Sequence, residues 1–304
     1  MQTWLVTGAA GFLGSNAGAF LRARANAVGQ VRTAASTSLY AQLLPVDLRD
    51  REAAGVLVRE LRPDVVLHAA AVSGHEQVDA DRAQAEAVNV HATSAIAQAC
   101  DFVGARMIYI STDAVFSGAT GDYREEDPPE PFSWYGETKL RGEQAVRDAL
   151  ADHLVVRTNF FGWSRTGRAS VLEFFVNSLR AGTRVRGYPD FVVTSIYAQA
   201  LLQSIWELNE LGATGIVHVA SRDARSKYEF GMLVAERFGL DSGLIARLGP
   251  DPDAHTTSRA RDLSLSTARA ASLLGHPLQT QAEGVAQAAG DSQLRAALLG
   301  GADV

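Results

Sequence analysis

A glycine-rich segment near the start of the chain, residues 8–14 (GAAGFLG), constrains the fold most strongly. A short apolar run over residues 4–7 leads into it, and a helix-forming stretch over residues 16–25 follows. In a strand–turn–helix of this kind, the first glycine permits a tight turn, the second lets the backbone approach a pyrophosphate, and the third lets the helix pack against the strand. The helix N-terminus adds N–H groups that bind the anion. We therefore expect cofactor contacts from Gly8, Gly11, Phe12, Leu13 and Gly14.

Strand-like and helix-like segments alternate through the first half of the chain. The expected strands are residues 28–33, 65–71, 106–111 and 154–158, and the expected helices are residues 49–61, 79–104 and 135–150. This alternation predicts an α/β fold, a Rossmann-type doubly wound parallel sheet with helices on both faces. Ligands of such sheets bind beyond the carboxyl ends of the strands. Residues 8–14, 69–72 and 111–113 should therefore share one edge.

The second half carries fewer signals of parallel strands. Its expected elements are helices over residues 170–181, 196–211, 228–238 and 267–274 and a short strand over residues 215–220. We predict a dinucleotide-binding domain over residues 1–160, rejoined by part of residues 190–212. Residues 161–304 should form mainly a smaller, C-terminal substrate-binding domain. The Ala/Gly-rich tail after Gln281 is expected to fray.

Composition excludes several kinds of partner. The chain has 28 basic and 34 acidic residues among 304, a formal net charge of −6, which offers no basic field for nucleic acid or an anionic membrane. No apolar run approaches the roughly 18 residues of a membrane span, and we expect no targeting leader. The single cysteine, Cys100, excludes an intrachain disulfide and indicates a cytoplasmic location. The seven histidines lack ligand spacing, so no metal site is expected.

Two short motifs carry candidate chemistry. Tyr135 and Lys139 lie four residues apart, one turn along an expected helix, and Lys139 and Lys227 are the two lysines of the chain. An ammonium near a phenol lowers the pKa of the phenol, which suits a proton donor or acceptor. Ser111-Thr112-Asp113 ends an expected strand, so a hydroxyl there can hold a carbonyl oxygen while Tyr135 protonates it.

These motifs belong to longer strings that resemble a known family. Residues 111–118 (STDAVFSG) and 135–143 (YGETKLRGE) resemble an extended short-chain dehydrogenase/reductase, and within that superfamily the dTDP-4-dehydrorhamnose reductase family. The resemblance implies reduction of a nucleotide-linked 4-keto-6-deoxy sugar. Thr112 would hold the carbonyl, Tyr135 would donate the proton, and Lys139 would anchor the cofactor ribose and tune the phenol.

Substrate contacts are also carried over from the resemblance. Asp113 precedes Ala114, where sugar dehydratases have an acidic pair, which argues against dehydration. The family pattern is only partly kept at residues 188–194 and at residues 259–261, so the identity of the sugar is less constrained than the reaction. A packed histidine is the expected reading of His68, where the family commonly has a small polar residue. The substrate residues expected are Thr112, Asp113, Val115, Asn159, Arg259 and Arg261.

The cofactor is expected to be NADP (NADPH), with NAD as an acceptable second choice. An acidic residue about 20 positions after the glycine turn would bind the ribose diol of NAD, but residues 28–38 contain none and Arg32 could bind a 2′-phosphate. The resemblance also implies that Asp47 and Leu48 lie beside the adenine. Further cofactor contacts are expected from Ala69, Ala70, Ala71, Ser111, Tyr135 and Lys139.

Other functions stay open at the level of sequence. The runner-up is a nucleotide-sugar epimerase of the same superfamily. A ketoreductase of a glycoside or antibiotic intermediate also fits, because the divergent half of the chain reads the substrate. A non-catalytic, cofactor-binding regulatory subunit would use the same fold, since fold alone does not determine function. A homodimer is open as well.

Overall fold

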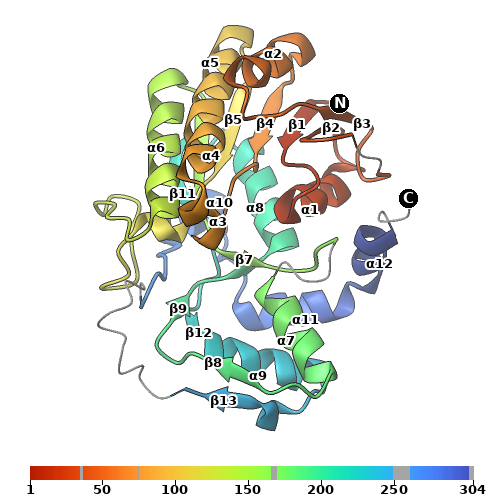
Figure 1. The fold of residues 1–304 in the computed structure, drawn as a ribbon, viewed down its shortest axis with the longest axis vertical. Coiled ribbons are helices and arrows are strands. Elements are labelled where there is room, and N and C mark those ends of the chain that lie inside the picture. Colours follow the sequence, from red (N-terminus) through yellow and green to blue (C-terminus); the bar gives the residue numbers. More distant parts are fainter. Residues whose placement is uncertain (35–36, 74, 166–169, 249–260, 301–304) are drawn as a thin grey trace.

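The structure is a computed structural model that describes residues 1–34, 37–73, 75–165, 170–248 and 261–300. Its centre is a seven-stranded parallel sheet with the order β11-β6-β5-β4-β1-β2-β3 (Figure 1). The strands are β1 (Thr3–Thr7), β2 (Asn26–Val31), β3 (Gln42–Pro45), β4 (Val65–His68), β5 (Arg106–Ile110), β6 (His153–Arg157) and β11 (Gly215–His218). The expected Rossmann-type parallel sheet is confirmed.

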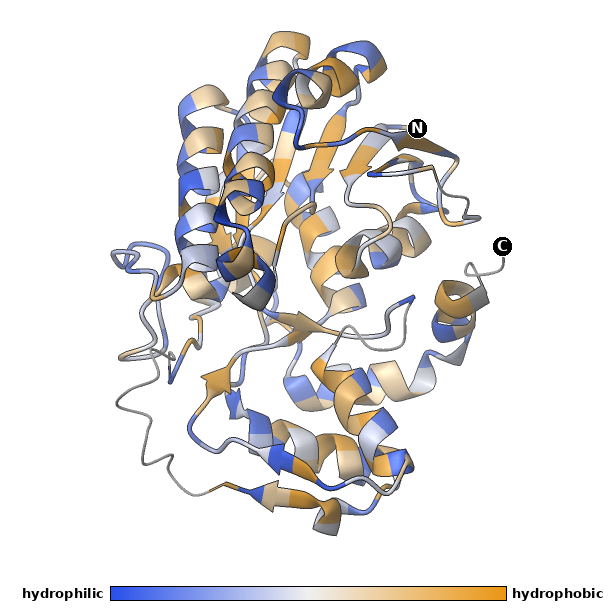
Figure 2. Cartoon of the chain, in the orientation of Figure 1, coloured by the Kyte–Doolittle hydropathy of each residue, from blue (hydrophilic) through white to orange (hydrophobic). Residues whose placement is uncertain are grey.

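Helices cover both faces of this sheet because its strands are apolar on both sides. In β1, Leu5 packs into one buried cluster, while Trp4 and Val6 pack into another. The Leu5 side is covered by α2 (Arg51–Leu61), α5 (Thr93–Val103) and α6 (Trp134–Ala149), and the other side by α1 (Phe12–Leu21) and α8 (Ala198–Glu210). Figure 2 shows the apolar strands between amphipathic helices. Alternation of side chains along a strand explains the two clusters.

The chain between β4 and β5 differs from the single helix expected over residues 79–104. It forms α3 (His75–Ala80), α4 (Arg82–Glu86), a π-helical turn (Ala87–Ala92) and α5. The first break occurs at Asp81, which has non-helical dihedral angles and accepts a hydrogen bond from the Gln84 N–H as the cap of α4. An aspartate competes with the helix in this way because its short side chain reaches nearby backbone donors.

A smaller lobe lies beyond the carboxyl edge of the sheet, at the bottom of Figure 1. Three strand pairs build it: β8 (Val185–Gly187) with β13 (Ile245–Arg247), β9 (Val192–Val193) with β12 (Arg225–Ser226), and β7 (Phe160–Phe161) with β10 (Ile196–Tyr197). Helices α7 (Val171–Arg180), α9 (Lys227–Phe238) and α11 (Gln281–Gly290) pack on them. We propose that this lobe binds the substrate.

Part of the second half returns to the sheet. Helix α8 packs on α1, and its Trp206 stacks on Trp4 of β1 with ring centroids 5.3 Å apart. Strand β11 extends the sheet by pairing with β6, which places His218 opposite Arg157. The remaining short elements are two 3₁₀ turns, Asp113–Val115 and Ser242–Leu244, and helices α10 (Ala268–Leu274) and α12 (Ser292–Gly300).

Several boundaries differ from those expected. Helix α1 begins at Phe12, inside the glycine segment, because Gly11 is its N-cap. Strand β3 was missed, since it is short and ends at Pro45. The fraying expected after Gln281 is not found over residues 281–290: a capping box between Thr280 and Glu283 starts α11, and Val285 and Ala288 are buried. Among the described residues, no helix combines the length and apolar character of a membrane span.

Candidate active site

The glycine turn is shaped by backbone contacts that side chains would obstruct. Gly8 has a φ of +67°, and a Cβ there would lie 2.9 Å from the Cα of Ala70. A Cβ on Gly14 would lie 2.1 Å from the Gly8 carbonyl oxygen. Gly11 is exposed and is the N-cap of α1, with Phe12 half-buried and Leu13 and Gly14 buried behind it. These features fit a pyrophosphate, which binds backbone N–H groups at a helix N-terminus.

Gln30 supports this turn, although it was not among the expected site residues. Its Oε1 accepts a hydrogen bond from the Gly8 N–H at 2.9 Å, and its Nε2 donates to the Val46 carbonyl at 2.6 Å. The side chain is buried and ties the glycine turn to the segment after β3. A polar residue inside the apolar strand 26–31 was the available signal.

The expected adenine end of the cofactor site lies at the ends of β2 and β3. Arg32 is exposed just beyond β2, and Leu48 is buried. Asp47 forms an ion pair with Arg49 at 2.5 Å. Hydrogen bonds from Arg49, and to a smaller extent the charges of Arg49 and Arg32, hold the pKa of Asp47 below its usual range. Arg32, Asp47 and Arg49 therefore lie together at this end of the sheet.

Thr112 and Tyr135 meet because helix α6 starts directly against the 3₁₀ turn after β5. Ser133 caps α6 through the Gly136 N–H, and a Cβ on Gly136 would lie 2.1 Å from the Ala114 carbonyl oxygen. The Tyr135 and Thr112 side chains share a hydrogen bond. Burial raises the pKa of Tyr135 to about 12, the bond to Thr112 opposes the rise, and the charge of Asp113 adds to it.

Lys139 lies one helical turn after Tyr135 and is buried. Its Nζ lies 4.0 Å from the centroid of the Tyr109 ring, a cation–π contact. Burial lowers the pKa of Lys139 to about 7, and the carboxylate of Glu143 opposes this shift. The expected lowering of the Tyr135 pKa is therefore not found. Burial disfavours the charged form of both groups, the ammonium of Lys139 and the phenolate of Tyr135.

Asp113 lies at the centre of a second set of contacts. Its Oδ1 accepts a hydrogen bond from the Thr112 hydroxyl at 3.0 Å, and its Oδ2 accepts one from Asn159 Nδ2 at 2.8 Å. Asn159 in turn accepts a hydrogen bond from the Ser195 hydroxyl, a contact that local patterns could not reveal. Burial raises the pKa of Asp113 to about 6. The structure thus brings Thr112, Asp113 and Asn159 together.

Other expected site residues lie differently. The Ser111 hydroxyl donates to Glu143 at 2.5 Å, so a cofactor contact would have to use its backbone. Val115 is fully buried in the cluster of Phe116, Tyr123 and Leu265, which keeps its side chain away from any open site. Arg261 is exposed, and its backbone N–H donates to the Gly118 carbonyl. Ala69 and Ala70 are half-buried and Ala71 is exposed beyond β4, whereas Arg259 lies outside the described residues.

His68 is packed, as expected. Its Nδ1 lies 2.7 Å from the Thr7 hydroxyl and its Nε2 lies 2.9 Å from the Thr93 hydroxyl. Burial, aided by the charge of Lys139, lowers its pKa to about 3, so the ring is neutral. The imidazole links the strand before the glycine turn to helix α5.

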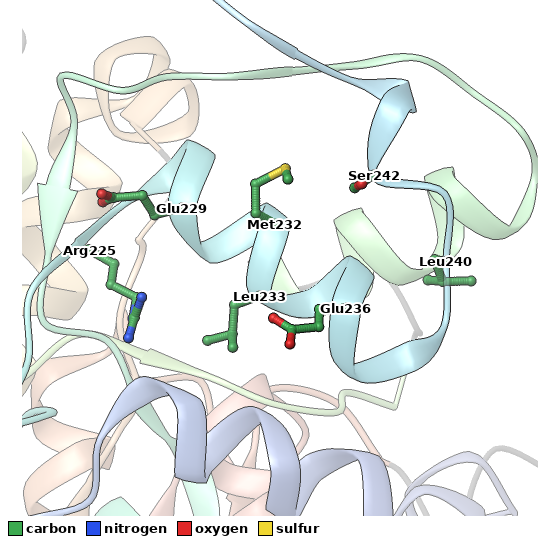
Figure 3. A pocket seen from close by; sticks show the side chains of 7 residues that line it. All are labelled: Arg225, Glu229, Met232, Leu233, Glu236, Leu240 and Ser242. Atoms are coloured by element: carbon green, nitrogen blue, oxygen red, sulfur yellow. The ribbon is translucent and has the colours of Figure 1, made fainter.

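A surface groove of about 460 Å³ lies over α9 in the smaller lobe (Figure 3). Arg225, Glu229, Leu233 and Glu236 are among its lining residues, and none of the expected site residues lines it. The described residues contain no group of three or more His, Cys, Asp or Glu side chains placed to hold a metal ion. The chemistry therefore concentrates at the edge of the sheet around Tyr135.

Known proteins are similar to this chain along most of its length. The family model described as the RmlD substrate binding domain matches residues 1–293. The probable low-salt glycan biosynthesis reductase Agl14 of Haloferax volcanii is 34% identical over 244 residues, which are 79% of this chain and 81% of that protein. The dTDP-4-dehydrorhamnose reductase of Mycobacterium tuberculosis H37Rv is 33% identical over 244 residues, which are 78% of this chain and 76% of that enzyme.

Solved structures share the fold. A hypothetical dTDP-4-dehydrorhamnose reductase from Sulfolobus tokodaii superposes with a TM-score of 0.80 at 30% identity, over 92% of this chain and 97% of that chain. The dTDP-4-dehydrorhamnose reductase of Bacillus anthracis in complex with NADP superposes with a TM-score of 0.81 at 22% identity, over 96% and 99%. With the family model covering nearly the whole length, the chain belongs to the dTDP-4-dehydrorhamnose reductase family.

Proposed function

We propose that the protein is an NADPH-dependent reductase of a keto group on a nucleotide-linked 4-keto-6-deoxy sugar. The observation that carries this proposal is the shared hydrogen bond of Tyr135 and Thr112, with Lys139 one turn away, on the sheet edge that also carries the glycine turn. A nicotinamide dinucleotide, when bound, supplies the hydride. The family relatives that are named as reductases support the reaction type.

The protein's own residues would supply the proton and orient the ketone. Tyr135 is held in its protonated form, because burial raises the pKa of its phenol to about 12, so a proton is available for the carbonyl oxygen. The Thr112 hydroxyl, beside the phenol, would hold the same oxygen. Lys139 would bind the cofactor ribose, and its charge would stabilise the phenolate left after proton transfer. Asp113 and Asn159 would contact the sugar.

NADPH is the proposed cofactor, with NADH as a weaker alternative. Arg32 and Arg49 lie near Asp47 beyond the ends of β2 and β3 and would contact a 2′-phosphate there, since guanidinium groups bind phosphate oxygens strongly. The structural neighbour from Bacillus anthracis was solved with NADP. The cytoplasm is the proposed location, where the buried Cys100 would remain a reduced thiol.

The test is loss of the reduced-nicotinamide absorbance, with NADPH and NADH in parallel and an enzymatically prepared dTDP-4-keto-6-deoxyhexose as substrate. We expect NADPH to be consumed faster than NADH, and consumption to disappear in Tyr135→Phe. Binding of NADPH without consumption would contradict the proposal. In that case, product stereochemistry would test the epimerase, and capture of a partner protein would test the regulatory subunit.

A further inference from the structure

Beneath the expected catalytic residues lies a buried charged cluster formed by Glu143, Arg157 and Ser111. Glu143 is 1% exposed and Arg157 is 2% exposed. Arg157 donates from Nε to Glu143 Oε1 at 3.0 Å and from Nη2 to Oε2 at 2.8 Å, a two-pronged ion pair. The Ser111 hydroxyl donates to the same Oε1 at 2.5 Å. Both oxygens of the Glu143 carboxylate thus accept hydrogen bonds, as a buried anion requires.

The three members come from three elements that each carry a site residue. Glu143 lies on α6, one turn after Lys139 and two after Tyr135. Ser111 follows β5 and precedes Thr112. Arg157 ends β6, two residues before Asn159, which binds Asp113. The carboxylate of Glu143 therefore joins α6 to the two strand ends that hold the other polar groups.

The Glu143 carboxylate also lies one helical turn from Lys139. Removing an ammonium from water favours its neutral form unless an anion lies close by. The groups around Lys139 are Tyr135 and Glu143 on its own helix, Tyr109 on β5 and neutral His68 on β4, and Arg157 on β6 is paired with Glu143. Among them, Glu143 is the anion that opposes deprotonation of Lys139.

We propose that Glu143 is a positioning residue of this site: it fastens the ends of β5 and β6 to α6 and places a buried carboxylate one helical turn from Lys139. The proposal rests on the proposed function only where it concerns the rate of the reaction. The effect of Glu143 on the pKa of Lys139 can be measured in the protein without substrate. A buried ion pair adds little to stability when compared with apolar residues of the same volume. Stability alone therefore does not explain the Glu143–Arg157 pair, and we look for its role in the site.

The chain allows a direct measurement, because Lys139 and Lys227 are its two lysines. Full-length protein labelled with ¹³C at the lysine ε-carbon gives two side-chain signals, and Lys227→Arg assigns them. Titration of the Lys139 signal then reports its pKa. In Glu143→Gln we expect this pKa to fall by at least about one unit, a tenfold loss of proton affinity. A folded Glu143→Gln protein whose Lys139 pKa equals that of the wild type would overturn the proposal.

Glu173 on α7 offers a matched control. It is also 1% exposed, and its carboxylate accepts hydrogen bonds from the Ser164 N–H at 2.7 Å and the Ser164 hydroxyl at 2.8 Å. Glu173→Gln therefore removes an equally buried negative charge from the smaller lobe. We expect it to leave the Lys139 pKa unchanged. An equal shift in both variants would mean that the effect is a general consequence of loosened packing, and would overturn the proposal.

Loss of Glu143 leaves Arg157 buried without its partner, so the single variant could fail to fold. Glu143→Gln/Arg157→Gln removes both charges and keeps polar side chains of similar length. We expect the Lys139 pKa to fall in this variant too, though less than in Glu143→Gln, because Arg157 no longer opposes the ammonium. An unchanged or higher pKa in the folded double variant would overturn the electrostatic role.

Ser111→Ala separates positioning from charge, since it removes a hydrogen bond and leaves Glu143 ionised. We expect an unchanged Lys139 pKa, a kcat lowered about tenfold through displaced Thr112, and a KM for NADPH close to that of the wild type. In Glu143→Gln the alkaline limb of the kcat/KM profile should move to lower pH. If no variant or wild type consumes NADPH, the proposed function fails, while the lysine titration still decides the role of Glu143.

Discussion

The glycine turn and the Tyr135 cluster share one edge of the sheet, yet they are built in opposite ways. The turn is exposed only at residues 10–11, and its shape depends on missing side-chain atoms at Gly8 and Gly14. The cluster consists of inward-facing side chains whose ionisation is displaced: burial raises the pKa of Tyr135 to about 12 and that of Asp113 to about 6, and lowers that of Lys139 to about 7. One region is defined by steric limits and the other by charge.

This difference teaches which changes each region tolerates. Adding a methyl group to the turn introduces an overlap that backbone atoms cannot relieve. Removing a proton donor or a charge from the Tyr135 cluster preserves the shape of the site and removes its chemistry. The following substitutions, from the largest expected effect to the smallest, are chosen to test that contrast.

Tyr135→Phe should give the largest effect, because it removes the proposed proton donor and preserves the ring. We expect kcat to fall by about 10²–10⁴-fold, the range for a positioned general acid, with NADPH affinity close to that of the wild type. Steady-state kinetics and fluorescence titration of NADPH provide the two measurements. Tyr197→Phe, which removes a hydroxyl bonded to Asp291 in the smaller lobe, is the control and should retain kcat.

Gly14→Ala should break the other region by sterics. Its Cβ would meet the Gly8 carbonyl at 2.1 Å, so we expect a loss of about 2–3 kcal/mol in the free energy of unfolding together with weakened NADPH binding. Urea denaturation with and without NADPH measures both. Gly290→Ala is the matched helical control, because nothing lies within 4 Å of the position that its Cβ would take. Equal stabilities for the two variants would contradict the steric account.

Asp113→Asn should sharpen the contrast by showing that the cluster costs stability. The pKa of Asp113 rises from its ordinary 3.8 to about 6 in the folded protein, so the folded state binds more protons than the unfolded state between these values. Wild-type stability should therefore fall by about 1–3 kcal/mol, relative to the variant, as pH rises from 4 to 7. Denaturation at several pH values measures this. Parallel curves for the two proteins, with exposed Asp101→Asn as control, would refute it.

Arg32→Ala should give the smallest effect, since the side chain is exposed. We expect NADPH affinity to fall about tenfold, equivalent to about 1.4 kcal/mol, with NADH affinity unchanged. Binding titrations with both cofactors decide this, with exposed Arg184→Ala as control. Equal losses for NADPH and NADH would show that Arg32 does not read the 2′-phosphate.

The parts that could be predicted from sequence are those whose residues are neighbours along the chain. The glycine turn, the Tyr135–Lys139 pair and the alternating strands each depend on local spacing, and the parallel sheet follows from them. Two features depend on tertiary packing instead. Val115 is buried in the 3₁₀ turn, and the Ser111 hydroxyl points toward Glu143. The Ser111 hydroxyl is therefore engaged by Glu143, and its expected cofactor contact stays a prediction.

The parts that escaped prediction rest on distant pairings. Gln30 reaches back to Gly8, Ser195 supports Asn159, and β11 joins the sheet beside β6 after the chain has passed through the smaller lobe. Strand pairing of this kind is set by tertiary context more than by local propensity. The same reason explains why the short strands of the smaller lobe were not expected.

The most direct test of the proposed reaction follows the hydride itself. NADPH carrying deuterium at the transferred position, incubated with the protein and a dTDP-4-keto-6-deoxyhexose, should yield a reduced sugar with one deuterium on the former carbonyl carbon, detected by mass spectrometry and NMR. Tyr135→Phe should give almost none. A sugar product with changed configuration and no deuterium, formed without consumption of NADPH, would contradict the reductase and identify an epimerase.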